Sequence, residues 1–243
     1  LEWRSLMAAW QQCAEGQAHF VMITGEAGAG KTRLAQEFMR WVGRQGHTVI
    51  HTRAYAGEEG LAYAPIIEWL RSEPLRAALM RLEPVWQSEL ARLAPDLLSA
   101  HTEFYLPDAH GERWQRQRLF TALMRAFLAV EQPLALVVDD LQWCDQETLE
   151  WLHHLLHSAP EASLLVLGTV RLGEIDGEHP LSALLLHLRS AGQVTEIDLA
   201  PLNESETAEL AAHVAEHPLA AALVDRLYQV SEGNPLFITE SVR

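Results

Sequence analysis

The predicted fold depends on one stretch of this sequence, Gly25-Glu26-Ala27-Gly28-Ala29-Gly30-Lys31-Thr32. It follows the pattern G-x-x-x-x-G-K-T of a phosphate-binding loop, whose backbone N–H groups surround phosphate and whose lysine reaches the β- and γ-phosphates. The alternative, a chance match, has a probability of about 1% at the usual glycine content. Lysines and arginines total 18, and all of them except Lys31 are arginines. Because a compact ammonium suits nucleotide phosphates better than a flat guanidinium, the loop predicts nucleotide binding.

The residues on either side complete a strand, loop and helix unit. His19–Thr24 is a largely apolar run typical of a buried strand, and Arg33–Val42 has helical spacing. This geometry directs backbone N–H groups and a helix N-terminus at phosphate, and the Thr32 hydroxyl can ligate Mg²⁺. The predicted nucleotide-binding residues of this unit are Gly25, Glu26, Ala27, Gly28, Ala29, Gly30, Lys31, Thr32 and Arg33.

Length and charge restrict the class of protein. A chain of 243 residues fits one large α/β domain, or a core domain with a smaller appendage. The net charge is −15, and residues 131–243 account for all of it, with 4 basic and 19 acidic groups. We expect no direct nucleic-acid contact by this segment, because no basic stripe is evident. The arginines nearest to such a stripe lie at helical spacing and predict a solvated face: Arg113, Arg116, Arg118 and Arg125.

Nothing in the sequence indicates a membrane or secreted protein. No apolar run approaches the roughly 18 residues that span a bilayer, and no signal segment is evident at the start. Cys13 and Cys144 form no CxxC pair, which favours a reducing cytoplasm over a disulfide framework. We expect a cytoplasmic protein without membrane contact. Since the sequence begins at Leu1 without an initiator Met, we also expect a domain excised from a longer chain.

Five apolar runs predict an α/β fold, a five-stranded parallel sheet flanked by helices. The predicted nucleotide-binding domain covers residues 1–200, with a helical insert at about 60–130 between the second and third strands. The predicted strands are Phe20–Thr24, Thr48–Thr52, Leu134–Val138, Ser163–Thr169 and Thr195–Leu199. The predicted helices of the insert are Pro65–Ser72, Leu75–Leu93 and Trp114–Val130, with a mobile stretch around His101–Gly111.

The last part of the chain, residues 201–243, predicts helices only and is interpreted as the start of a small, truncated helical lid domain. Capping residues at Asn203-Glu204-Ser205-Glu206 predict a helix over about 203–213. A second helix is expected over about 219–231, and Gly233-Asn234-Pro235 ends it.

A second motif, Leu134-Ala135-Leu136-Val137-Val138-Asp139-Asp140, is an apolar strand that ends in two carboxylates, the pattern of a Walker B motif. Asp139 is expected to hold Mg²⁺ together with Thr32, directly or through water. Asp140 is the candidate for polarising the attacking water. The alternative is a strand that ends in an ordinary polar turn.

Arg171 directly follows the apolar strand Leu164–Val170, where an arginine can reach a γ-phosphate and report its presence. The alternative is an arginine that pairs with a surface acid such as Glu174. The catalytic candidates are therefore Lys31, Asp140 and Arg171. Histidines after Asp145 could indicate a metal site, but we favour ordinary surface histidines because no carboxylate shares their helix face: His153, His154 and His157.

Four blocks in order along the chain carry a resemblance to a known family. They are Gly25–Leu34, Asp139-Asp140-Leu141-Gln142-Trp143-Cys144-Asp145, Gly168-Thr169-Val170-Arg171 and Glu232-Gly233-Asn234-Pro235-Leu236-Phe237. The sequence resembles the ATPase domain of the STAND class within the AAA+-related P-loop NTPases. It is most similar to the form found in large LuxR-type bacterial transcriptional regulators and in cyclase-associated regulators. The resemblance covers nearly the whole chain.

The resemblance implies a strand order in which the Arg171 strand lies between the strands of the two phosphate-site motifs. It also implies that Arg171 is the γ-phosphate sensor and that Pro235 packs against adenine. The alternative for Gly233-Asn234-Pro235 is a simple helix-ending turn. The sequence starts after the point where the family usually carries a Gly-Arg pair that helps to frame the base, and no trans-acting arginine finger stands out, so we expect poor ATP hydrolysis by this segment alone.

The leading hypothesis is an ATP/ADP-binding regulatory switch with slow Mg²⁺-dependent hydrolysis, in which ADP closes the helical tail onto the core through Pro235. The resemblance implies that further domains of the same polypeptide, including a DNA-binding module, respond to its state. The main alternative is a ring-forming motor or loader ATPase that acts on protein or DNA, and a nucleotide-dependent oligomer is possible in either case. A small-molecule kinase is the third and weakest hypothesis.

Overall fold

The computed structural model describes residues 1–243 with the exception of 58–59, 98–111, 132, 176 and 178. Its centre is a five-stranded, all-parallel sheet with the order β2-β3-β4-β1-β5. The predicted fold class is therefore confirmed, and β4, which precedes Arg171, lies between β1 and β3 as the resemblance implied. The strands are β1 His19–Gly25, β2 Thr48–Arg53, β3 Leu134–Asp139, β4 Leu164–Val170 and β5 Val194–Leu199.

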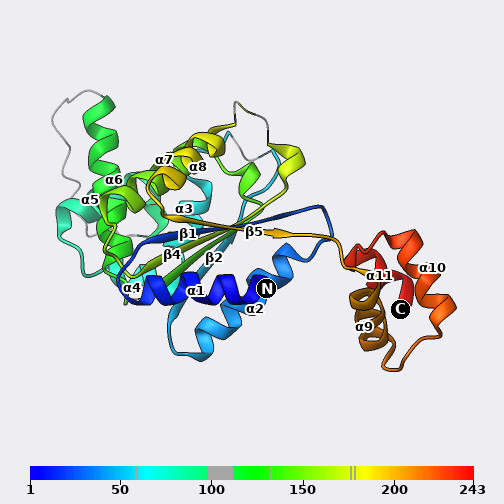
Figure 1. The fold of residues 1–243 in the computed structure, drawn as a ribbon. Helices are drawn as coiled ribbons and strands as arrows, with labels where there is room; N and C mark the ends of the chain where they lie inside the picture. Colours follow the sequence, from blue (N-terminus) through cyan, green and yellow to red (C-terminus); the bar gives the residue numbers. More distant parts are fainter. Residues whose placement is uncertain (58–59, 98–111, 132, 176, 178) are drawn as a thin grey trace.

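Successive side chains of the central strands point to opposite faces of the sheet, so the core has two layers, one between each face and the helices that cover it (Figure 1). On β1, Val21 and Ile23 pack against α1 (Glu2–Ala14) and α2 (Lys31–Arg44), whereas Phe20 and Met22 face the helices on the other side. Both faces of the sheet are covered, so β1, β3 and β4 read as continuous apolar runs, as parallel strands do.

The helical insert covers the second face of the sheet together with α7 (Gln146–Ser158) and α8 (Pro180–Ser190). The prediction of one helix over Leu75–Leu93 was wrong, because the chain forms two helices there. Pro84 lacks a backbone N–H and cannot continue a helix, so it occupies the first turn of a new one. The expected mobile stretch at His101–Gly111 lies outside the described residues. The described helices of the insert are α3 Ala64–Leu70, α4 Glu73–Leu79, α5 Pro84–Leu93 and α6 Glu112–Leu128, with the 3-10 turn η1 Pro95–Leu97.

The chain leaves the sheet after β5 and forms three tail helices at one end of the molecule (Figure 1). The first begins with the predicted capping box, in which Asn203 and Glu206 satisfy each other's backbone N–H groups. Two helices were predicted, and the structure adds a third because Pro235 begins a helix after Asn234 caps it. The tail helices are α9 Glu204–Ala215, α10 Ala221–Ser231 and α11 Pro235–Val242.

Two expectations about charged surface residues were only partly right. Of the arginines expected on a solvated face, Arg118 is instead half-buried and pairs with the buried Glu89 at 2.6 Å. His157 is exposed, but His153 and His154 are half-buried between neighbouring rings. Within the described residues, no group of three or more His, Cys, Asp or Glu side chains is arranged to hold a metal ion.

Both cysteines are buried free thiols, as the absence of a disulfide framework predicted. Burial raises the pKa of the Cys13 thiol to about 12. Among the helices of the described part of the chain, none has the length and apolarity that crossing a bilayer requires.

Candidate functional site

The loop between β1 and α2 has glycines at positions that few other residues could occupy. Gly25 and Gly28 have φ angles of 146° and 82°, which side-chain-bearing residues rarely adopt. A Cβ on Gly25 would also lie 2.8 Å from the backbone oxygen of Leu199. Since α2 begins at Lys31, its first N–H groups have no intrahelical acceptor and stay available to an anion.

Lys31 is buried at the base of this loop, and its ammonium group faces its own backbone. Its Nζ donates hydrogen bonds to the carbonyl oxygens of Gly25 at 2.9 Å and Glu26 at 2.7 Å. Both acceptors are neutral, so the positive charge retains its capacity to pair with a phosphate. Burial, and to a lesser extent the nearby Arg171 charge, lower the pKa of Lys31 below its ordinary value.

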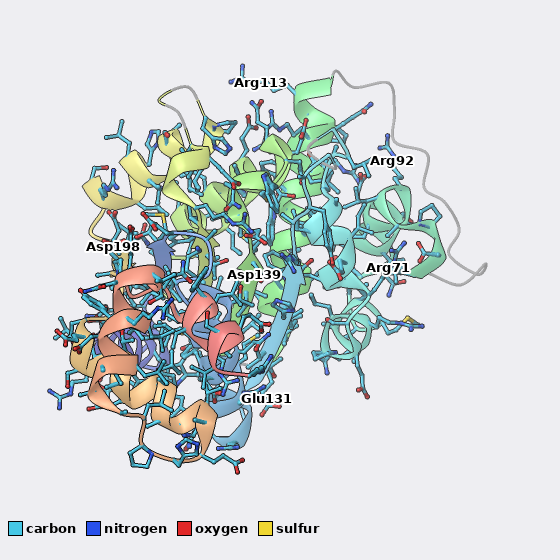
Figure 2. The ribbon with its side chains drawn as sticks, turned by 90° about the vertical axis from the view of Figure 1, so that its right-hand side faces the viewer. Arg71, Arg92, Arg113, Glu131, Asp139 and Asp198 are labelled. Carbon is cyan, nitrogen blue, oxygen red and sulfur yellow. The ribbon has the colours of Figure 1, made fainter. Side chains whose placement is uncertain are left out.

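Thr32 and Asp139, predicted as a metal-binding pair from distant parts of the sequence, are in contact. The Thr32 hydroxyl lies 3.0 Å from both carboxylate oxygens of Asp139, and Thr169 donates a hydrogen bond to the same carboxylate. Mg²⁺ in nucleotide sites is typically held by one or two protein oxygens together with phosphates and water. One hydroxyl and one carboxylate at the mouth of a glycine loop therefore fit this ion. Figure 2, viewed from the side of the tail helices, places Asp139 near the centre of the molecule.

Asp140, which directly follows β3, is buried and adopts a left-handed conformation with a φ of 57°. Its Oδ2 accepts hydrogen bonds from Arg53 Nη2 at 2.7 Å and Arg53 Nε at 3.1 Å. Its Oδ1 lies 3.4 Å from Arg171 Nε. The candidate for polarising water is therefore held between two guanidinium groups.

Arg53 is a residue of this site that the sequence interpretation missed. It ends β2, pairs in register with Asp139 on β3, and lines the same cleft as Lys31 and Arg171. A signal was available, since Arg53 directly follows the predicted strand Thr48–Thr52. Parallel strands place the residues at their carboxyl ends along one edge, where ligands of α/β sheets bind.

Arg171 makes the contact proposed as its alternative role and also lies in the cleft. Its Nη1 is 3.3 Å from Glu174 Oε1, and its guanidinium lies 5.0 Å from the centre of the Trp143 ring. It nevertheless lines the cleft that contains Lys31 and Thr32, which has a volume of about 880 Å³. The ion pair with Glu174 therefore does not exclude the predicted sensor role, because the Arg171 side chain also borders the cleft.

The tail contacts the glycine loop through the segment that was predicted to end a helix. The Asn234 side chain donates a hydrogen bond to Ala27 O at 2.8 Å, and Leu236 N lies 3.2 Å from Gly28 O. Pro235 lines both the cleft of about 880 Å³ that contains Lys31, here called the main cleft, and an adjoining one of about 580 Å³ that Ala29 and Leu199 also line.

The remaining predicted residues have simpler surroundings. Glu26 and Ala29 line the smaller cleft, and Gly30 lines the main one. Arg33 is 72% exposed and pairs with Glu37 but also lines the cleft that contains Lys31, and its part in binding stays a prediction. Asp145 caps α7 and also accepts a hydrogen bond from the Tyr63 backbone at 2.8 Å, which ties the insert to the end of the second motif.

The comparisons with known proteins agree with this geometry. The solved structures to which the chain is similar include a variant of Thermotoga maritima RuvB, with a TM-score of 0.52 and 15% identity over 98% of this chain and 58% of that one. AMPPCP-bound DnaA from Aquifex aeolicus gives a TM-score of 0.51 at 14% identity over 98% of this chain and 59% of that one. At these identities the likeness concerns the fold alone.

A curated relative and a family model extend the comparison to sequence. The chain is 26% identical over 250 residues to an uncharacterized protein of Rhizobium meliloti (strain 1021), and the match spans 95% of this chain but only 23% of that protein. The model that describes the AAA ATPase domain matches residues 1–167. Because this match covers more than half of the chain, the protein belongs to the AAA ATPase domain family.

Proposed function

We propose that this chain is the nucleotide-dependent switch of a signal-transduction ATPase of the STAND class, and that it binds ATP and ADP with Mg²⁺ and hydrolyses ATP slowly. Residues 1–200 form the nucleotide-binding domain and residues 201–243 belong to a helical lid. The observation that carries the proposal is the pair of hydrogen bonds from Asn234 and Leu236 to the glycine loop. Through them, a change at the phosphates acts directly on the tail.

Each residue of the site has a role in this proposal. Lys31 and the N–H groups at the start of α2 bind the phosphates, and Arg171 contacts the γ-phosphate when it is present. Thr32 and Asp139 hold Mg²⁺, which neutralises phosphate charge when bound. Asp140 orients the attacking water and accepts its proton.

The surroundings of Asp140 support slow hydrolysis. Oδ2 accepts two hydrogen bonds from Arg53, and Oδ1 accepts one from Gln142 and lies beside Arg171, so an attacking water competes with partners at both oxygens. Hydrolysis therefore requires a rearrangement of at least one guanidinium before Asp140 can act. A rate limited in this way suits a switch, which has to remain in each state for some time.

The lid responds to the nucleotide through Pro235, whose ring packs against adenine when ADP is bound. Moving such a two-state equilibrium from mostly closed to mostly open takes about 5 kcal/mol of differential binding. A γ-phosphate contact to Arg171 supplies part of this free energy. In the complete protein, further domains of the same polypeptide respond to the lid, as in a multidomain transcriptional regulator of the LuxR type.

Hydrogen exchange along α10 and α11 tests the proposal. We expect slower exchange with ADP than without nucleotide, and faster exchange with a non-hydrolysable ATP analogue than with ADP. Equal exchange in all three states would remove the mechanism of the switch. Nucleotide-dependent assembly into a closed ring with fast turnover would instead favour the motor or loader ATPase, and sedimentation under the same conditions measures it.

Variants of the two carboxylates should separate metal binding from hydrolysis. Asp139→Ala removes the metal ligand, so we expect Mg²⁺-dependent ATP affinity to fall by about tenfold or more. Asp140→Ala should leave nucleotide affinity within about threefold and lower kcat by about 100-fold or more, the usual contribution of a general base. Titration calorimetry with and without Mg²⁺ and a phosphate-release assay measure the two effects. Equal losses of affinity in both variants would show that the division of roles is wrong.

A further inference from the structure

A buried side chain beside the site is that of Gln142, which the sequence interpretation gave no role of its own. It lies on η2 (Leu141–Trp143), the turn that follows Asp140, and only 3% of its surface is exposed. Its Nε2 donates hydrogen bonds to Asp140 Oδ1 at 3.2 Å and to Glu174 Oε2 at 3.2 Å. Its Oε1 accepts a hydrogen bond from the Arg171 backbone N–H at 3.2 Å. One amide therefore contacts three residues, of which Asp140 and Arg171 line the cleft that contains Lys31.

The chemistry of these contacts is specific to a neutral amide. An NH₂ group has two hydrogens, and here each one serves a different carboxylate, while the amide oxygen receives the third bond. Asp140 and Glu174 are also the two carboxylates that contact the Arg171 guanidinium, at 3.4 Å and 3.3 Å. Gln142 and Arg171 thus provide hydrogen-bond donors to the same pair of carboxylates.

We propose that Gln142 is a positioning residue that sets how readily Arg171 leaves Asp140 and Glu174 for a γ-phosphate. While the amide donates to both carboxylates, they remain partly satisfied when the guanidinium moves away. Without the Gln142 donors, departure of Arg171 would leave Glu174 without either of these two partners and would leave Asp140 with Arg53 alone. Arg171 would therefore stay bound to the two carboxylates. The inference rests on the proposed function, because it concerns the ATP-bound state of that same site.

The position of Gln142 in the fold supports this role. Its own backbone oxygen lies 2.9 Å from the His179 ring at the start of α8, so the turn that carries it is anchored from a second element. Trp143, the next residue, provides the ring against which the Arg171 guanidinium packs. The same turn therefore positions both the Gln142 amide and the ring that packs against Arg171. We expect a substitution at residue 142 to change the contacts of Arg171 more than the stability of the fold.

The test compares two substitutions by their affinities for an ATP analogue and for ADP. Gln142→Met keeps the length and removes all three hydrogen bonds. We expect it to lower the ratio of analogue affinity to ADP affinity by about fivefold to tenfold, the usual effect of leaving a buried acceptor unsatisfied, with ADP affinity unchanged. Gln142→Glu keeps the size and the acceptor for Arg171 N, but replaces the donor by a negative oxygen that repels the carboxylates and attracts the guanidinium. We expect a larger loss in this variant.

The controls make the outcomes distinct. Gln146→Met makes the same chemical change on the same stretch of chain, but Gln146 is exposed and bonds only to Glu150, so the affinity ratio should stay at the wild-type value. If Gln142→Met does not fold, the ratio in Gln142→Glu tests the inference by itself. An unchanged ratio in a folded variant, or an equal loss for both nucleotides, overturns the positioning role alone. A wild-type chain that binds neither nucleotide overturns the proposed function as well.

Discussion

Replacing Lys31 by alanine is expected to abolish tight nucleotide binding, since no second lysine exists to replace it. Its ammonium is buried and its present hydrogen-bond acceptors are the carbonyls of Gly25 and Glu26. Removing one member of a buried, hydrogen-bonded charge pair costs about 2–5 kcal/mol, so the Kd for ATP should rise by about 30-fold to several thousandfold. Titration calorimetry with Mg²⁺-ATP and Mg²⁺-ADP measures the change.

A matched variant separates this effect from a change of net charge. Arg40 lies on the same helix as Lys31, is exposed, and pairs with Glu37 at 2.7 Å. Arg40→Ala removes one positive charge as well, but should change nucleotide affinity by no more than about twofold, because exposed ion pairs contribute little. If the two variants bound nucleotide equally well, the loop would not be the phosphate site.

The parts of the fold that the sequence predicted are those in which local pattern and burial agree. The sheet is buried on both faces, so its inner strands are continuous apolar runs, and every predicted strand end lies within one residue of the observed one. The contact between Thr32 and Asp139 followed from the same logic, because the carboxyl ends of β1 and β3 lie on one edge of the sheet.

The parts that were missed depend on where distant residues meet or on what a proline does. Pro84 was placed inside one predicted helix and Pro235 in a turn that ends a helix, but each occupies the first turn of a new helix, a position that proline favours. The contact of Arg53 with Asp140 requires β2 to lie beside β3, although residues 54–133 separate the two strands in the chain. Local periodicity contains no information of this kind.

The contact of the tail with the loop depends on one backbone position. Gly233 has a φ of 76°, and a Cβ added to it would lie 2.0 Å from the backbone oxygen of Leu202. Leu202 N in turn donates a hydrogen bond to Gly233 O at 2.9 Å. This close approach of two backbone segments places Asn234 and Leu236 against the glycine loop. A substitution of Gly233 should therefore release the tail from the loop.

Gly233→Ala is therefore expected to release the tail helices from the nucleotide loop. The left-handed conformation alone costs alanine about 1–2 kcal/mol, and the collision with Leu202 adds to this cost because backbone has to move. Opening of α10 and α11 should become more than about tenfold more frequent, which hydrogen exchange measures. Since coupling between two sites is reciprocal, ADP affinity should fall by a similar factor if the tail contacts bound ADP.

Gly46→Ala is the matched control for this experiment. Gly46 has a similar φ of 83°, but an added Cβ there would meet nothing within 4 Å, so only the conformational cost remains. Gly46 also lies in the connection between α2 and β2, and its substitution should leave tail exchange and ADP affinity unchanged. A faster tail in Gly233→Ala with wild-type ADP affinity would mean that the tail contacts the loop without contacting the nucleotide. In that case the lid would be a structural appendage, because a body that does not distinguish bound from free nucleotide cannot report its state.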